Sequence, residues 1–345
     1  MAREREGKVP LREVLPTQEN GEYIDPGRLF LTFTGQGSHF PGMGMDLYQN
    51  SQEAREVFHE ADRIVGFPLS EIMFRDPEKT LIRTDIAQIA IVTFEEATRR
   101  TVEALSGREL DPKAFAGHSL GTYEAMVAAE VTSFPDTIRL VQERGRLMQE
   151  AAEKNPGTMA SITGLDLAVL EGICAETGAE IGLINTDKLI VITGDKRAVA
   201  QARDLATASK AKGVTELQVN GAWHSSLMES TQEGLQKAIS DIPFKDPKKP
   251  IYDNSTGELL TTAEGIQKAL VRGLCERVCW NTLFKRGAAG ASAVIEIGPR
   301  DFLSRFAKQM VDRSTKIIPV SSFESAQNLA HILQQPSDHN KLLNA

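Results

Sequence analysis

The sequence contains only three cysteines among its 345 residues, namely Cys174, Cys275 and Cys279. They provide no disulfide framework, and Cys275 and Cys279, one helical turn apart, have no histidine close by in sequence to complete a zinc site. We therefore expect reduced thiols in a cytoplasmic protein, and no metal centre.

Long apolar runs and basic clusters are also missing. No apolar stretch is long enough to span a bilayer, which argues against a membrane protein. The formal net charge of −8 and the lack of a dense Lys/Arg cluster argue against a nucleic-acid binder, since prolines interrupt the nearest candidate at residues 245–249. Residues 1–25 mix arginine with glutamate, so they resemble neither a secretory signal nor a transit peptide, and we interpret them as an extension.

What the sequence does contain is typical of a globular protein. Hydrophobic residues make up 41% and charged residues 25% of the chain, and its length can bury a large core. Length alone is compatible with one large domain or two moderate ones.

The most informative segment is residues 114–129. A short apolar run enters the turn Gly117-His118-Ser119-Leu120-Gly121, and a helical pattern follows. A Gly-x-Ser-x-Gly turn between a strand and a helix typically exposes a nucleophilic serine, and the helix directs free backbone N–H groups toward a developing oxyanion. A surface turn rich in small residues is the alternative interpretation of the same pattern.

The order of the remaining elements predicts an α/β fold. Strand and helix patterns alternate over residues 28–156 and 220–320, which indicates an α/β-hydrolase-like core with a mainly parallel sheet covered by helices. The patterns in residues 157–219 predict elements in the order β-α-β-β-α-β, which is the order of a small ferredoxin-like subdomain inserted into that core. We expect an N-terminal extension at 1–27 and a C-terminal tail at 321–345.

A nucleophilic serine needs a base, and His224 has the most favourable position among the six histidines. It follows a predicted strand and precedes a predicted helix, where side chains project into a cleft. His118 is adjacent to Ser119, and neighbours at a tight turn point apart. A buried structural histidine is the alternative role for His224.

Five motifs occur in order along the chain. They are Gly35-Gln36-Gly37-Ser38, residues 117–121, Arg144-Gly145-Arg146-Leu147-Met148-Gln149, His224-Ser225 and Glu296-Ile297-Gly298-Pro299. With these motifs, residues 28 to 320 resemble the malonyl-CoA:acyl carrier protein transacylases and the related acyltransferase domains of polyketide synthases.

The resemblance implies the catalytic roles. Ser119 would be the nucleophile and His224 its base, steadied by a backbone carbonyl instead of an aspartate. The matching position lies in residues 270–274, where Gly273 replaces a usual glutamine but keeps its carbonyl. The backbone N–H groups of Gln36 and Leu120 would form the oxyanion hole.

The resemblance also implies how the substrate is selected. Arg144 would hold the free carboxylate of a malonyl group with two parallel hydrogen bonds, although a surface arginine pairing along its helix is the alternative. Gln88 would line the pocket, and Trp223 would crowd the branch methyl of methylmalonyl. The chain also departs from the family pattern at Thr122, His39 and Arg300.

The implied activity is malonyl transfer from malonyl-CoA to the phosphopantetheine thiol of acyl carrier protein, through a malonyl-serine, in fatty acid synthesis. Alternatives are a free-standing acyltransferase of a polyketide pathway, a hydrolase that clears acyl groups, and a catalytically silent carrier-docking protein. We expect a monomer that uses malonyl-CoA as substrate and has no tightly bound cofactor. Because carrier proteins are acidic, Lys285, Arg286 and Arg300 are candidates for a local docking patch.

Overall fold

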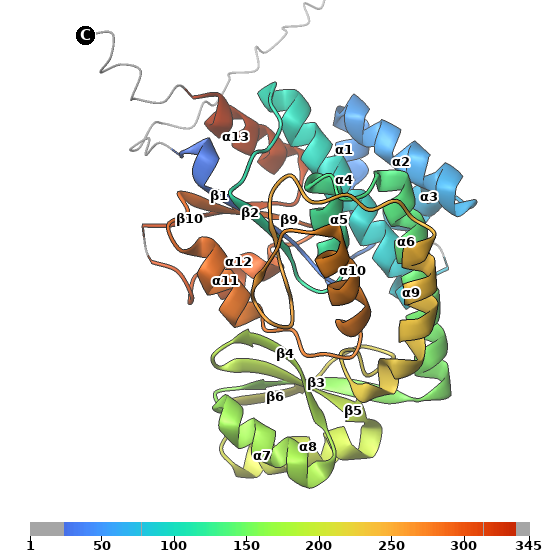
Figure 1. Ribbon diagram of the computed structural model, residues 1–345, viewed down its shortest axis with the longest axis vertical. Helices are drawn as coiled ribbons and strands as arrows, with labels where there is room; N and C mark the ends of the chain where they lie inside the picture. Colours follow the sequence, from blue (N-terminus) through green and yellow to red (C-terminus); the bar gives the residue numbers. More distant parts are fainter. Residues whose placement is uncertain (1–23, 77, 313, 336–345) are drawn as a thin grey trace, which may run out of the picture. The chain divides into compact units, whose positions relative to one another are not determined.

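A six-stranded sheet lies at the centre of the larger part of the structure (Figure 1). The structure is a computed structural model that describes residues 24–76, 78–312 and 314–335. The strand order is β10-β9-β1-β2-β7-β8, and every neighbouring pair is parallel except β7–β8. The strands are β1 (Leu29–Phe33), β2 (Ala114–Gly117), β7 (Ile251–Tyr252), β8 (Leu259–Leu260), β9 (Ala293–Ile297) and β10 (Lys316–Val320). This agrees with the predicted α/β-hydrolase-like core.

Alternate residues of the central strands enter two separate cores, because successive side chains of a strand point to opposite faces. Leu31, Phe115 and Ile295 belong to the larger core, on one face of the sheet. Phe30 and Val294 belong to the smaller core, on the other face. Since both faces are covered, the strands are apolar without polar alternation.

Helices cover both faces of this sheet (Figure 1). The α-helices of this part are α1 (Met45–Asn50), α2 (Gln52–Val65), α3 (Leu69–Arg75), α4 (Thr84–Ser106), α5 (Gly121–Ala128), α6 (Phe134–Lys154), α9 (Gln232–Ser240), α10 (Ala263–Arg272), α11 (Trp280–Ala288), α12 (Phe302–Ala307) and α13 (Phe323–Gln334). Short 3₁₀ helices span Pro26–Arg28, Thr80–Ile82 and Ser226–Thr231. Among the described residues, no helix is both long and apolar enough to cross a membrane.

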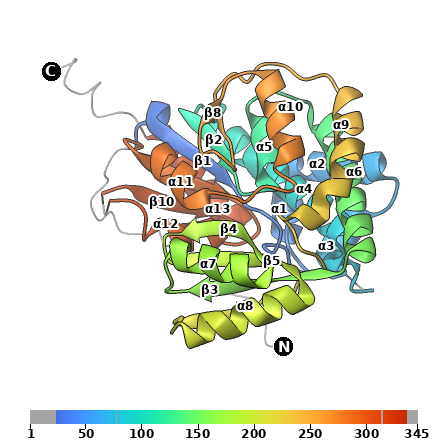
Figure 2. The ribbon, with the colours of Figure 1, turned by 60° about the horizontal axis from the view of Figure 1, so that its bottom comes forward.

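The inserted segment forms a second sheet, antiparallel throughout, in the order β4-β5-β3-β6. Its elements are β3 (Gly157–Thr163), α7 (Leu167–Thr177), β4 (Glu180–Thr186), β5 (Leu189–Asp195), α8 (Lys196–Ala208) and β6 (Gly213–Glu216). The two helices pack on the sheet through an apolar cluster of their own (Figure 2). This strand order is that of the predicted ferredoxin-like subdomain.

The expected domain ends differ from those in the structure. The expected boundary at residue 320 separates β10 from α13, yet α13 packs on α4 and Gln334 Nε2 donates to the Leu105 carbonyl at 2.8 Å. At the other end, Ile24 is already buried. Residues 24–335 thus form one unit, because apolar side chains at both ends enter its core. The rest of the predicted extension and tail, residues 1–23 and 336–345, lie outside the described residues.

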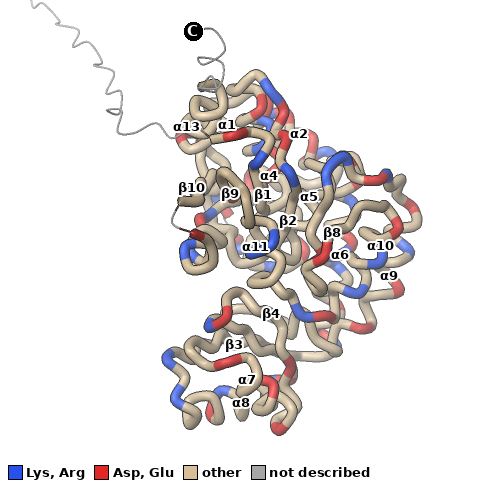
Figure 3. The backbone as a smooth tube through the Cα atoms, turned by 60° about the vertical axis from the view of Figure 1, so that its left-hand side comes forward, with Lys and Arg blue, Asp and Glu red and all other residues tan. Residues whose placement is uncertain are grey.

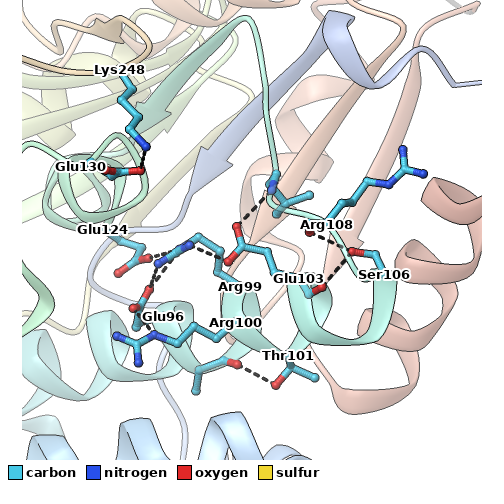
Figure 4. Close-up of polar contacts among 12 residues, drawn as sticks. Glu96, Arg99, Arg100, Thr101, Glu103, Ser106, Arg108, Glu124, Glu130 and Lys248 are labelled. Carbon is cyan, nitrogen blue, oxygen red and sulfur yellow. Dashed lines mark hydrogen bonds and ion pairs between the residues drawn. The ribbon is translucent and has the colours of Figure 1, made fainter.

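A buried ionic cluster joins α5 to α4 behind the sheet (Figure 4). The Arg99 guanidinium contacts Glu96 at 2.5 Å, Glu103 at 2.8 Å and Glu124 at 3.2 Å. Burial opposes the ionisation of Glu96, but Arg99 and Arg100 hold its pKa below the ordinary value. Because Glu124 lies on the helix that follows the serine turn, the cluster holds that helix against α4.

Candidate active site

Ser119 occupies a strained turn between β2 and α5. Its φ of 52° is in the left-handed region that few non-glycine residues adopt. A Cβ on Gly117 would lie 1.8 Å from the Gly121 carbonyl carbon, and one on Gly121 would lie 2.4 Å from the Phe33 carbonyl oxygen. The two glycines are therefore required by the close backbone approach that exposes the serine.

Asn254, which follows β7, holds this turn from the side. Its Oδ1 accepts from the Ser119 backbone N–H at 2.8 Å, and its Nδ2 donates to the Gly117 carbonyl at 2.8 Å and to Thr122 Oγ1 at 3.0 Å. Sequence reasoning missed Asn254, although it stands at the carboxyl end of a parallel strand beside β2, where functional side chains gather.

Ser119 and His224 form a hydrogen-bonded pair, with 2.8 Å between Ser119 Oγ and His224 Nε2. The other ring nitrogen, Nδ1, lies 3.1 Å from the carbonyl oxygen of Glu276. A carbonyl can only accept, so Nδ1 carries the hydrogen and Nε2 is left to accept from the serine. The His224 ring is thus oriented by a backbone carbonyl.

That carbonyl belongs to Glu276, not to the expected Gly273. The chain keeps turning after α10, with the N–H groups of Cys275 and Glu276 both bonded to the Arg272 carbonyl at 3.0 and 3.1 Å. This extra turn brings the carbonyl of Glu276 to the histidine. Gly273 lines the same pocket, and a hydrogen bond from its backbone makes a smaller contribution to the pKa of His224.

The electrostatic surroundings keep His224 neutral. Burial, followed by the positive charge of Arg144, lowers the pKa of His224 to about 3. A neutral imidazole is the form that can take a proton from the serine.

Arg144 projects from α6 into the same site and is only 4% exposed. Its Nη1 donates to Gln88 Oε1 at 2.6 Å, its Nη2 donates to Ser119 Oγ at 3.2 Å, and its guanidinium lies over the Tyr123 ring. Within the described part of the chain it has no carboxylate partner, whereas Arg146, two residues further on, pairs with two glutamates at the surface. Burial lowers the pKa of Arg144. The site therefore holds a cation without a counter-ion.

Gln36 and Leu120 lie together in the pocket with Ser119. In residues 24–76, 78–312 and 314–335, neither backbone N–H donates to a protein acceptor. The Gln36 side chain bonds to Thr84 Oγ1 at 3.3 Å and accepts from Gln88 Nε2 at 3.4 Å, so these residues join α4 to the loop after β1. Two free N–H groups beside a serine can stabilise an oxyanion.

The pocket extends to both sides of Ser119, Arg144 and His224. One side, about 440 Å³, is lined by α10 and the residues after β7, including Asn254 and Gly273. The other, about 510 Å³, includes Met148, Met159, Leu183, Leu217 and Trp223. Trp223 therefore lines the site as expected, and the second side lies between the core and the ferredoxin-like subdomain.

His118, the neighbour of Ser119 in the turn, bonds to the inserted subdomain and not to Ser119. Its Nε2 lies 2.8 Å from Asn185 Oδ1 of β4, and its ring contacts Trp280. Burial lowers the pKa of His118. This contact, which nothing in the sequence indicated, ties the serine turn to the inserted subdomain.

Acidic and basic residues are interspersed over both parts of the structure (Figure 3). Of the three basic residues expected near the cleft, Lys285 pairs with Asp187 at 2.7 Å and Arg286 with Glu258 at 2.5 Å. Arg300 is exposed and lies over the Phe40 ring at 5.0 Å. No group of three or more metal-binding side chains occurs among the residues described.

A serine on a strand–turn–helix, a neutral histidine bonded to it and two free backbone N–H groups define a serine-dependent acyltransferase of the α/β class. The sequence matches the Acyl transferase domain family over residues 30–336. It is 33% identical over 318 residues to the malonyl CoA-acyl carrier protein transacylase of Bacillus subtilis, covering 90% of this chain and 99% of the relative. The chain belongs to the malonyl CoA-acyl carrier protein transacylase family.

Solved structures agree with this membership. The malonyl CoA-acyl carrier protein transacylase of Coxiella burnetii superimposes with a TM-score of 0.85 at 30% identity, covering 91% of this chain and 100% of that one. A malonyl-transacylase solved in complex with its type II PKS acyl-carrier protein gives a TM-score of 0.84 at 32% identity, covering 88% and 99%.

Proposed function

We propose that this protein transfers a malonyl group from malonyl-CoA to the phosphopantetheine thiol of an acyl carrier protein, by way of a malonyl ester on Ser119. The observation that carries the proposal is Arg144, a buried cation with no carboxylate partner among the described residues, bonded at 3.2 Å to the oxygen of the nucleophile. An acyl group that reaches Ser119 therefore meets a guanidinium ready to bind an anion. Malonyl carries such an anion, and acetyl does not.

The first half-reaction forms the ester. Ser119 Oγ attacks the thioester carbonyl carbon while its proton passes to His224 Nε2, 2.8 Å away. The carbonyl oxygen becomes an oxyanion that accepts from the N–H groups of Gln36 and Leu120. When the carbon–sulfur bond breaks, His224 returns the proton to the departing sulfur, and free coenzyme A leaves.

The second half-reaction runs the same steps in reverse order. The carrier thiol gives its proton to His224 Nε2 and attacks the ester carbonyl, and the Ser119 carbon–oxygen bond breaks as the serine takes the proton back. Atoms and charges balance without an oxidant, a metal or a tightly bound cofactor. The Glu276 carbonyl, 3.1 Å from Nδ1, keeps the ring in one tautomer throughout.

Arg144 selects the acyl group. Its fork of N–H donors can hold both oxygens of the malonyl carboxylate, and Gln88 Oε1, which accepts from Nη1 at 2.6 Å, fixes the fork in place. Trp223, buried in the other side of the pocket, would crowd a branch methyl. Malonyl is therefore preferred to both acetyl and methylmalonyl.

The names of the relatives support the carrier protein as acceptor. We propose fatty acid synthesis as the pathway, with a monomeric enzyme that binds no nucleic acid and works in the cytoplasm, where its three free thiols stay reduced. The solved complex with a type II PKS carrier keeps a polyketide role as the second candidate. Comparing transfer rates to a fatty-acid-type and a polyketide-type carrier separates the two.

The decisive experiment is intact-protein mass measurement after brief incubation with malonyl-CoA, acetyl-CoA or methylmalonyl-CoA. We expect a malonyl adduct that is absent in a folded Ser119→Ala variant and that passes to added holo-carrier. Release of free malonate without carrier would identify a hydrolase instead. Absence of adduct and of free acid with all three thioesters would identify a catalytically silent protein and refute the proposal.

A further inference from the structure

Glu95 is a fully buried acidic residue of α4 that the mechanism above does not use. Its Oε1 accepts two hydrogen bonds from Thr34, one from the backbone N–H at 2.8 Å and one from the hydroxyl at 2.7 Å. Its Oε2 is buried without a hydrogen-bond partner in the described part of the chain. Glu95 thus accepts both hydrogen bonds from Thr34, the first residue after β1.

Thr34 opens the loop that carries Gln36. Its Oγ1 lies 3.1 Å from Ser38 Oγ, and Ser38 Oγ donates to the Gly35 carbonyl at 2.9 Å. Each hydroxyl has one proton, and the bonds to Glu95 and to the Gly35 carbonyl use both, so Thr34 and Ser38 lie in polar contact without a third hydrogen bond. These contacts link Glu95 to the segment around Gln36, whose N–H has no protein acceptor among the described residues.

The same loop touches the serine turn through its backbone. The His118 N–H donates to the Phe33 carbonyl at 2.9 Å. A Cβ on Gly35 would lie 2.5 Å from the His118 carbonyl oxygen, and one on Gly121 would lie 2.5 Å from the Thr34 carbonyl oxygen. Because the contact is this close, a shift of the loop changes the position of the Gln36 N–H relative to Leu120 N–H and Ser119.

Among the described residues, the groups that act on the charge of Glu95 include other carboxyl groups and no cation. Burial raises the pKa of Glu95 well above its ordinary value, although the two Thr34 bonds act in the opposite direction, and the charge of Glu296 adds to the increase. Glu124 of α5 is a second carboxyl group close enough to interact with Glu95. A neutral carboxyl group keeps its carbonyl-type oxygen as an acceptor, so the bonds to Thr34 do not require the charge.

We propose that Glu95 is a positioning residue for acyl transfer, which fixes the loop of Thr34 so that the backbone N–H of Gln36 points at the oxyanion. The role rests on the proposed function, because it needs an oxyanion formed at Ser119. It accounts for the two hydrogen bonds that this buried carboxyl group accepts from Thr34. It acts on the rate of acylation and not on the binding of the carboxylate.

Four variants test this role. Thr34→Val keeps the shape of the side chain and removes its hydroxyl, Glu95→Leu removes both accepted bonds, and Glu95→Gln keeps an acceptor oxygen. The matched control is Thr98→Val, because Thr98 is equally buried in α4 and its hydroxyl bonds only to the Phe94 carbonyl of its own helix, at 2.8 Å. The measurements are kcat and KM for malonyl-CoA, the single-turnover rate of Ser119 acylation by mass, and the unfolding midpoint.

Loss of an oxyanion-hole donor lowers kcat by roughly 10²- to 10³-fold, and a displaced donor keeps part of its effect. We expect kcat to fall about tenfold in Thr34→Val and further in Glu95→Leu, with KM unchanged. Glu95→Gln and Thr98→Val should stay within about threefold of the parent.

Three results would overturn the role. The first is a folded Thr34→Val that acylates as fast as Thr98→Val, which stays informative even if Glu95→Leu does not fold. The second is a change in the Thr34 and Glu95 variants that affects KM alone and leaves kcat as in the parent. The third is a kcat in Glu95→Gln as low as that in Glu95→Leu. Absence of any adduct on the parent protein would refute the proposed function itself and this role with it, so the two failures are distinguishable.

Discussion

Replacement of Arg144 with alanine should separate malonyl from acetyl transfer. In the structure, the guanidinium is 4% exposed and has two hydrogen bonds, to Gln88 and to Ser119. A malonyl carboxylate bound there would be desolvated and would lose both of its charge-assisted bonds in the variant. Bonds to charged groups contribute about 1.5–3 kcal/mol each, so the pair is worth about 3–4 kcal/mol if the two are not fully additive.

A change of this size corresponds to a loss of roughly 10²- to 10³-fold in kcat/KM for malonyl-CoA. Acetyl-CoA has no carboxylate to lose, so its kcat/KM should change by less than about tenfold, through the broken contacts to Gln88 and Ser119 alone. The assay compares the two thioesters on the same preparation, with Arg146→Ala as control, since Arg146 lies on the same helix and pairs at the surface. Equal losses for both thioesters would refute the carboxylate role.

Two further predictions concern the base and the turn. Burial and the charge of Arg144 lower the pKa of His224 to about 3, so its neutral form persists as the pH falls and kcat/KM should show no protonation step near pH 6.5. In Arg144→Ala, measured with acetyl-CoA, the pKa of His224 seen in the pH profile should rise toward the ordinary value. A parent profile in which kcat/KM falls near pH 6.5 would contradict this explanation. Asn254→Ala removes three hydrogen bonds from the serine turn, each worth about 1 kcal/mol, so we expect a free energy of unfolding lower by about 2–3 kcal/mol in calorimetry together with slower acylation of Ser119. An unchanged acylation rate would show that the turn keeps its shape without Asn254.

Much of the fold could be predicted because it depends on local signals. Within the alternating patterns of residues 28–156, α6 (Phe134–Lys154) has a local signal at each end: Ser133 caps its start, and Asn155 and Pro156 follow its last residue. The strand–turn–helix around Ser119 was likewise predictable, since glycine spacing and apolar patterning lie within one short segment.

The expected tail shows where such signals are insufficient. Residues 321–345 contain a short helical stretch, but its pattern alone does not show which element the helix packs against. The position of α13 depends on α4, more than 200 residues earlier, as the bond from Gln334 to the Leu105 carbonyl illustrates. Long-range packing of this kind is not encoded in the spacing of neighbouring residues.

The residues of the candidate site also fall into two groups, those that a sequence motif indicates and those that no local pattern indicates. Ser119, His224 and Arg144 belong to motifs, so the sequence indicated them, and the structure brings them within hydrogen-bonding reach. Asn254 and Glu276 lie in connecting segments and act through one amide and one backbone carbonyl. Any residue type can supply a carbonyl, so no side-chain pattern could have distinguished Glu276 from Gly273.

The use of a backbone carbonyl to orient His224 is connected with the lack of a carboxylate partner for Arg144 among the described residues. A carboxylate in place of the Glu276 carbonyl, as in a serine triad, would stabilise the protonated ring, and its negative charge would act on Arg144, whose own charge already acts on His224. It would thereby weaken the attraction of the guanidinium for the substrate carboxylate that we propose. A neutral carbonyl at 3.1 Å orients the ring without this competition. Among the described residues no acidic side chain bonds to His224, which leaves the charge of Arg144 free for the substrate carboxylate that we propose.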